Sequence, residues 1–86
     1  MAWEVRIKPK AQKQIEKLHP LVAKRILGHI GKLADNPYPS GTKKIQGREN
    51  LFRVRVGDWR IVYEVMAKRL LVLVVNLGHR KDVYRR

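Results

Sequence analysis

The chain has 86 residues, and its 20 Lys and Arg against seven Asp and Glu give a formal net charge of +13. This length predicts a single domain, residues 1–86, and excludes a second one. A hydrophobic content of 44% excludes a disordered chain, and the absence of cysteine excludes disulfides, thiolate metal sites and a cysteine nucleophile.

Positive charge of this size predicts a polyanionic partner. Nucleic acid is the first class to consider, and an acidic protein that masks the surface is the second. An anionic membrane ranks third, because no segment pairs a basic helix face with a broad apolar one. The longest apolar run, residues 70–75, is far shorter than a membrane span of roughly 18 residues. Since the amino terminus also lacks a signal-peptide core, we expect a cytoplasmic protein that has no membrane partner.

The first half of the chain predicts a strand and two helices. Residues 2–8 alternate apolar and polar side chains, which indicates a strand with one buried face. Residues 10–18 and 21–35 carry apolar side chains at helical spacing. Pro20, which lies between the two segments, favours the start of the second helix. Gly28 and Gly31 each cost the second helix about 1 kcal/mol against alanine, and we attribute them to close helix packing first and to a functional hinge second.

The second half predicts three strands. After the chain-breaking residues 36–41, two alternating segments flank Gly57-Asp58, a glycine-first pair suited to a two-residue hairpin turn. The apolar run from Leu70 to Asn76 predicts the last strand. The order strand-helix-helix-strand-strand-strand predicts an α+β domain, with a helical hairpin packed on one face of a four-stranded antiparallel sheet. In this arrangement the first and second strands run antiparallel.

The predicted hairpin gathers arginines on one face. A two-residue turn sets Arg55 opposite Arg60, and it sets Arg53 opposite Val62. Like charges directly opposite each other cost stability, so an anion between them would explain the pairing. The alternative is a solvated face, on which long basic side chains cover apolar surface. The other face of the hairpin is apolar and can meet the helices: Phe52, Val54, Val56, Trp59, Ile61, Tyr63 and Val65.

The last predicted strand adds to the arginine cluster. It ends beside Trp59 and Arg60, which brings His79 and Arg80 to the same end of the sheet, with Tyr84 shortly beyond. Arginine binds phosphate oxygens through paired donors, and tyrosine can stack on a base. No carboxylate cluster accompanies these residues, so we expect neither a metal nor a small-molecule cofactor. Three basic residues that precede the arginine strand are candidate RNA contacts: Lys43, Lys44 and Arg48.

A family resemblance appears at these residues. The pattern FRVRVGDWRIVYEV, then an apolar strand, then LGHRKDVY, resembles the RelE family of toxin–antitoxin systems in the wider RelE/ParE superfamily, over essentially the whole chain. The resemblance implies a metal-independent, ribosome-dependent endoribonuclease that cuts messenger RNA in the ribosomal A site. It also implies a tightly bound antitoxin. The chain stops two residues after Tyr84, so the family's usual C-terminal helix is expected to be lacking.

The resemblance also implies residue roles. Basic residues that match Arg53 and Arg55 serve as base and phosphate ligand, and an arginine that matches Arg60 stabilises the transition state. An arginine that matches Arg80 has the acid role, and a tyrosine that matches Tyr84 stacks on the substrate nucleotide. The best-known relatives carry lysines at the first two positions, and arginine is a poor base. We therefore hypothesise that His79, an imidazole in the predicted cluster, does the acid or base work.

Two other functions stay open at this point. A ParE-type toxin that inhibits gyrase would share the fold, cleave no RNA and need no arginine cluster. A non-catalytic nucleic-acid-binding module would need the charge alone, and its affinity would fall evenly as any lysine is removed. Both toxin readings predict an antitoxin whose acidic or amphipathic segment covers the basic groove.

Overall fold

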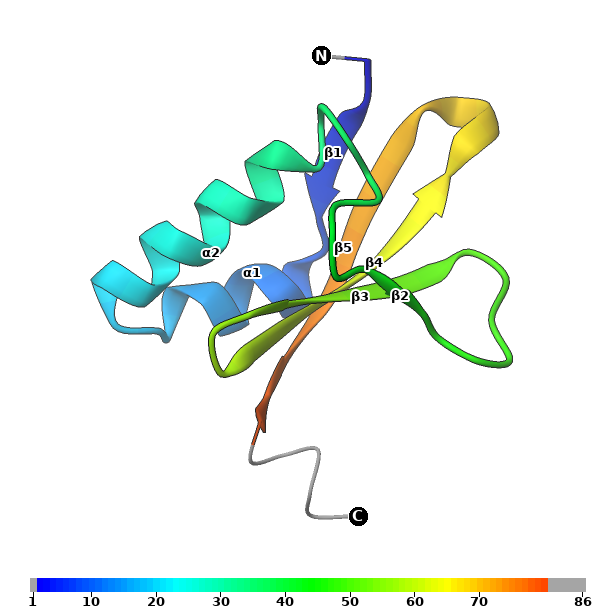
Figure 1. Cartoon of the computed structure of the whole chain (residues 1–86). Coiled ribbons are helices and arrows are strands. Elements are labelled where there is room, and N and C mark those ends of the chain that lie inside the picture. Colours follow the sequence, from blue (N-terminus) through cyan, green and yellow to red (C-terminus); the bar gives the residue numbers. More distant parts are fainter. Residues whose placement is uncertain (1, 81–86) are drawn as a thin grey trace.

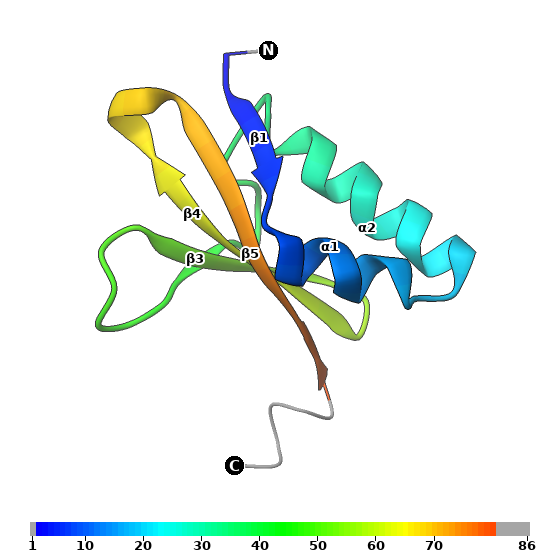
Figure 2. The same cartoon turned by 180° about the vertical axis from the view of Figure 1, so that it is seen from behind.

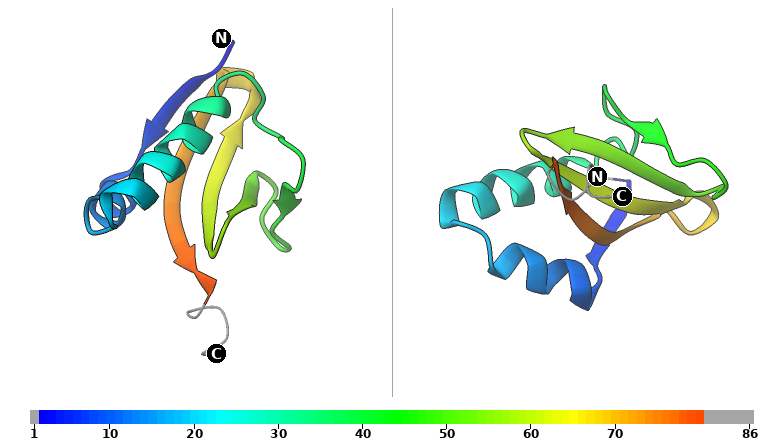
Figure 3. Two further views of the ribbon diagram at one scale, coloured as in Figure 1. Left: turned by 60° about the vertical axis from the view of Figure 1, so that its left-hand side comes forward. Right: turned by 90° about the horizontal axis from the view of Figure 1, so that it is seen from below.

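Two helices cover one face of a five-stranded sheet in the computed structural model, which describes residues 2–80 (Figure 1). The elements are β1 (Glu4–Ile7), α1 (Pro9–Glu16), α2 (Pro20–Lys32), β2 (Lys43–Lys44), β3 (Leu51–Val56), β4 (Trp59–Met66), the 3-10 helix η1 (Ala67–Arg69) and β5 (Leu71–His79). Figure 3 shows both helices on the same side of the sheet. The predicted α+β class and helical hairpin are confirmed. None of the helices within residues 2–80 is both long and apolar enough to cross a membrane.

The predicted four-stranded antiparallel sheet is wrong in its first strand. The sheet order is β1-β5-β4-β3-β2, and β1 runs parallel to β5, with Val5 opposite Val72 (Figure 2). The helical hairpin is the reason, because α2 returns the chain to the end of the sheet where β1 begins. There the Trp3 amide donates a hydrogen bond to the Ala34 carbonyl at 3.2 Å. The chain therefore enters β3 in the same direction as β1, and the sheet is mixed.

A fifth strand that the sequence did not predict completes the sheet edge. In β2, Lys43 lies opposite Arg53 and Lys44 lies opposite Phe52. A two-residue strand is too short to show the alternation that marks a strand in a sequence.

The hairpin prediction is confirmed residue by residue. Arg55 lies opposite Arg60, and Val56 lies opposite Trp59. The turn residue Gly57 has a φ of 61°, a conformation that glycine adopts readily. The last strand reaches Trp59 and Arg60 as expected, but it runs to His79 rather than ending at Asn76, and this sets Gly78 opposite Arg60.

The core lies between the helices and the inner face of this hairpin. Its fully buried side chains include Ile26 from α2, Ile61 and Tyr63 from β4, and Val72 and Val74 from β5. All of the hairpin residues predicted to face the helices belong to this cluster, with Phe52 and Trp59 half-buried at its edge. Since side chains alternate along a strand, the arginines between them face away from the helices.

One polar side chain fixes α1 to the end of β5. The Gln14 amide nitrogen donates to the Leu77 carbonyl at 3.0 Å, and the Leu77 amide donates to the Gln14 side-chain oxygen at 2.8 Å. Because β1 pairs only with the first part of β5, up to Val74, these bonds satisfy backbone groups that β1 does not reach. They hold the segment that leads to Arg80 in place.

Close helix packing does not explain Gly28. A Cβ atom added at Gly28 or at Gly31 would meet no atom within 4 Å outside the helix backbone. Gly28→Ala should therefore raise the free energy of unfolding by about 1 kcal/mol, because alanine has less backbone freedom to lose in a helix. Urea denaturation measures this change. A lower unfolding free energy in the variant would contradict the open surroundings of Gly28.

Candidate functional site

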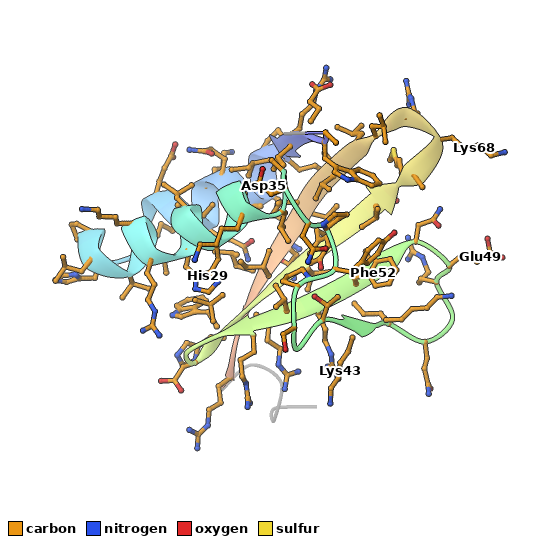
Figure 4. All side chains as sticks on the ribbon, turned by 45° about the horizontal axis from the view of Figure 1, so that its top comes forward. His29, Asp35, Lys43, Glu49, Phe52 and Lys68 are labelled. Carbon is orange, nitrogen blue, oxygen red and sulfur yellow. The ribbon has the colours of Figure 1, made fainter. Side chains whose placement is uncertain are left out.

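A basic pocket opens on the sheet face that points away from the helices. Its volume is about 280 Å³, and its wall consists of Gly41, Lys43, Arg53, Arg55 and Arg60. The strand register explains this grouping. Arg55 and Arg60 lie directly opposite each other, and Lys43 lies opposite Arg53 on the same face. Figure 4 shows Lys43 on the side of the sheet away from α2. We call these five residues the arginine pocket.

The arginine pocket holds positive charge that no carboxylate of residues 2–80 compensates. Within residues 2–80, the ion pairs join Arg6 to Glu4 and Arg80 to Asp58, and no carboxylate pairs with an arginine of the pocket. Arg53 and Arg60 are half-buried, which strengthens their mutual repulsion. Planar guanidinium groups bind phosphate oxygens through two parallel hydrogen bonds. The arrangement therefore fits an oxyanion such as a phosphodiester.

The buried Tyr63 fixes the segment that leads into β2, and β2 forms one side of the pocket wall. The Tyr63 hydroxyl donates to the Pro37 carbonyl at 2.8 Å and lies 3.3 Å from the Thr42 hydroxyl. Burial raises the pKa of Tyr63, with the Thr42 hydrogen bond acting in the opposite direction, so the phenol stays a neutral donor. These bonds run from the core to residues 37–42, and this segment leads directly into Lys43.

Tyr63→Phe should lower the free energy of unfolding by about 1–2 kcal/mol at neutral pH, since the Pro37 carbonyl loses its donor. The pKa of Tyr63 is raised in the folded state. Its contribution to stability is therefore complete below its ordinary value of 10 and is lost as pH rises through the raised value. Urea denaturation at pH 7.5 and above pH 10 should show the variant closer to wild type at the higher pH. An equal difference at both pH values would contradict this account.

The structure does not bring His79 into the arginine pocket. His79 lies opposite Trp59, and the two rings meet edge to face with centroids 4.7 Å apart. Trp59 packs against the core, so His79 lies on the helix-covered face, and Gly78 lies beside Arg60 instead. His79 therefore lies at the predicted end of the sheet, but on the face opposite to the predicted one.

Arg80 lies at the hairpin turn. Its amide donates to the Asp58 carbonyl at 2.7 Å, and its guanidinium lies 3.7 Å from the Asp58 carboxylate. This places Arg80 at the end of the strands that carry Arg55 and Arg60, although it is not part of the pocket wall. Tyr84 and the expectation about a C-terminal helix lie outside the described residues.

The predicted RNA contacts separate into two places. Lys43 lines the arginine pocket. Lys44 and Arg48 line a second hollow of about 360 Å³ formed by residues 44–49. Sequence reasoning missed Gly41 as a wall residue, and its φ of 90° marks a turn that the preceding Pro and Ser only suggest. In the part of the chain that the structure describes, no group of three His, Cys, Asp or Glu residues could hold a metal ion.

A family model described as the ParE toxin of the type II toxin–antitoxin system parDE matches residues 5–84. The chain belongs to this toxin family. The matched range includes every strand of the arginine pocket, and the resemblance to RelE within the RelE/ParE superfamily is confirmed.

Named relatives agree with this assignment. The toxin is 30% identical to an Escherichia coli protein described as a RelE-like toxin, over 98% of this chain and 92% of that protein. It is 26% identical to the toxin RelG of Mycobacterium tuberculosis over the full length of both.

Solved structures of toxin complexes share the fold. The toxin superimposes on an archaeal RelE–RelB complex from Pyrococcus horikoshii with a TM-score of 0.85 and 26% identity, over all of both chains. For the RelBE2 complex of M. tuberculosis the TM-score is 0.80, with 25% identity over 95% of each chain. The chain is a RelE-like toxin of a type II toxin–antitoxin system.

Proposed function

We propose that this toxin is a metal-independent, ribosome-dependent endoribonuclease that cuts messenger RNA in the ribosomal A site. The arginine pocket carries the proposal, because among residues 2–80 its wall contains three arginines and a lysine and no acidic residue. Cleavage of a phosphodiester places extra negative charge on the phosphate oxygens in the transition state. Fixed cationic donors are the most effective groups for stabilising such charge.

The register of β3 and β4 suggests which arginines bind the scissile phosphate. Arg55 and Arg60 lie directly opposite each other and hold the scissile phosphate between them, with Arg53 one step inward. The 2′-hydroxyl of the preceding nucleotide attacks the phosphorus, and the bond from phosphorus to the 5′-oxygen breaks. The products are a 2′,3′-cyclic phosphate and a 5′-hydroxyl end. By family resemblance, Arg80 acts near the leaving group and Tyr84 stacks on the substrate nucleotide.

The large net charge supports a ribosomal partner. A formal charge of +13 attracts ribosomal RNA, and this attraction weakens steeply as salt is added. We infer that Lys44 and Arg48, which line the hollow formed by residues 44–49, bind further RNA phosphates.

An antitoxin is the second partner that we infer. The archaeal toxins of P. horikoshii and Methanococcus jannaschii were solved as RelE–RelB complexes. We infer that the cognate antitoxin of this chain covers the arginine pocket with an acidic or amphipathic segment, because bound carboxylates would neutralise the unpaired arginines.

Ribosomes programmed with one defined message test this function. We expect primer extension to show a cut within the A-site codon when the toxin is added, with the same cut in the presence of a chelator. The free message should remain intact. An intact message on the ribosome would refute the proposal, and inhibition of gyrase by the same preparation would favour the ParE-type activity instead.

A further inference from the structure

The three arginines of the pocket do not supply a group that can accept a proton. The proposed reaction must remove a proton from the attacking 2′-hydroxyl. A guanidinium keeps its charge in proteins, so Arg53, Arg55 and Arg60 can bind the phosphate but cannot serve as the base. His79, the candidate from the sequence, lies on the opposite face of the sheet against Trp59.

Lys43 is the remaining basic residue of the pocket wall. It lies opposite Arg53 at the edge of the sheet and shares the pocket with the arginines. An amine can pass between its ammonium and neutral forms, which a guanidinium does not do. Its neighbour Lys44 faces the other way, opposite Phe52, and lines the second hollow.

The segment that carries Lys43 is anchored on the core. Thr42 contacts the Tyr63 hydroxyl, and the Thr42 amide donates to the Pro39 carbonyl at 3.0 Å. The Tyr63 hydroxyl also binds the Pro37 carbonyl at 2.8 Å. Backbone on both sides of Gly41 is therefore held in place. This matters because a catalytic group must be positioned within a fraction of an ångström of its productive geometry.

We propose that Lys43 is the general base of this pocket, an assignment that rests on the proposed endoribonuclease function. The neutral Lys43 amine takes the proton of the 2′-hydroxyl as the 2′-oxygen forms its bond to phosphorus. The bond from phosphorus to the 5′-oxygen breaks, and the 5′-oxygen takes a proton from solvent water. The Lys43 ammonium then releases its proton to solvent, which restores the starting state.

Lys43→Arg separates charge from proton transfer. The variant keeps a cation at the position but cannot act as a base, so cleavage of the programmed message should fall by about 10²–10⁴-fold. Affinity for ribosomes that carry an uncleavable 2′-deoxy message should stay within threefold of wild type. Lys68→Arg is the matched control, because it makes the same change on an exposed lysine of η1 that lines neither the arginine pocket nor the second hollow, and it should cleave at the wild-type rate.

Chemical rescue gives a second readout. Ethylamine added to Lys43→Ala should restore part of the cleavage rate, whereas guanidinium chloride at the same ionic strength should restore none. Wild-type cleavage by Lys43→Arg would overturn the assignment and leave the endoribonuclease function standing. A loss of cleavage matched by an equal loss of ribosome affinity would also overturn it, because Lys43 would then act in binding alone. Absence of cleavage by the wild-type toxin would overturn both proposals.

Discussion

Replacing Arg60 with alanine should slow cleavage of a programmed message by about 10²–10³-fold, the usual cost of removing one group that stabilises transition-state charge. Arg60 is half-buried in the wall of the arginine pocket and lies directly opposite Arg55. Within residues 2–80 it forms no ion pair, so its removal breaks no salt bridge that supports the fold. We therefore expect stability to be unchanged or slightly higher, because repulsion with Arg55 disappears.

Single-turnover cleavage at saturating ribosome concentration measures this effect apart from binding. Arg69→Ala is the matched control, since it removes an identical charge from an exposed residue of η1, at the other end of β4. Arg69→Ala should cleave at close to the wild-type rate. Equal rates for the two variants would mean that only the overall charge of the toxin matters, as a non-catalytic binding module would require.

The neighbouring substitution Ile61→Ala should instead act on the fold. Ile61 is 0% exposed and lies on the core face of the central strand β4, next to Arg60 in the chain but on the opposite face. Truncation of a buried isoleucine costs about 2–5 kcal/mol through lost burial and the cavity left behind. This is a large part of the roughly 5–15 kcal/mol that stabilises a typical domain.

Urea denaturation should show the loss as a lower midpoint. Leu27→Ala is the control, because it is a large apolar side chain of α2 that is 44% exposed and should cost much less. Cleavage by folded Ile61→Ala protein should remain close to wild type, since the arginine pocket is intact. Similar losses of stability at the two positions would contradict the core described above.

The hairpin could be predicted from sequence because two local rules determine it. Gly57-Asp58 defines a two-residue turn, and turn length sets which residues lie opposite each other. The period of two then separates Arg55 and Arg60 from Val56 and Ile61. Neither rule depends on the rest of the chain, so the predicted pairing of the hairpin residues agrees with the structure in detail.

The direction of β1 and the face of His79 depend on longer-range geometry. β1 is parallel to β5 because the helical hairpin returns the chain to the Trp3–Ala34 contact, which no local pattern encodes. The register of β5 depends on the η1 connection and on an irregularity between Val62 and Tyr63, and it sets His79 opposite Trp59. Lys43 lies in the pocket wall because β2 pairs with β3, and β2 is too short to be detected from the sequence.

The chemistry proposed for the arginine pocket is tested most directly by one change in the message rather than in the toxin. A message with a single 2′-deoxynucleotide on the 5′ side of the scissile phosphate lacks the attacking hydroxyl and keeps the phosphate that the arginines bind. Wild-type toxin should leave this message intact at that bond. The unmodified message should yield a 2′,3′-cyclic phosphate and a 5′-hydroxyl end. Cleavage of the deoxy message at the normal rate would contradict attack by the 2′-hydroxyl.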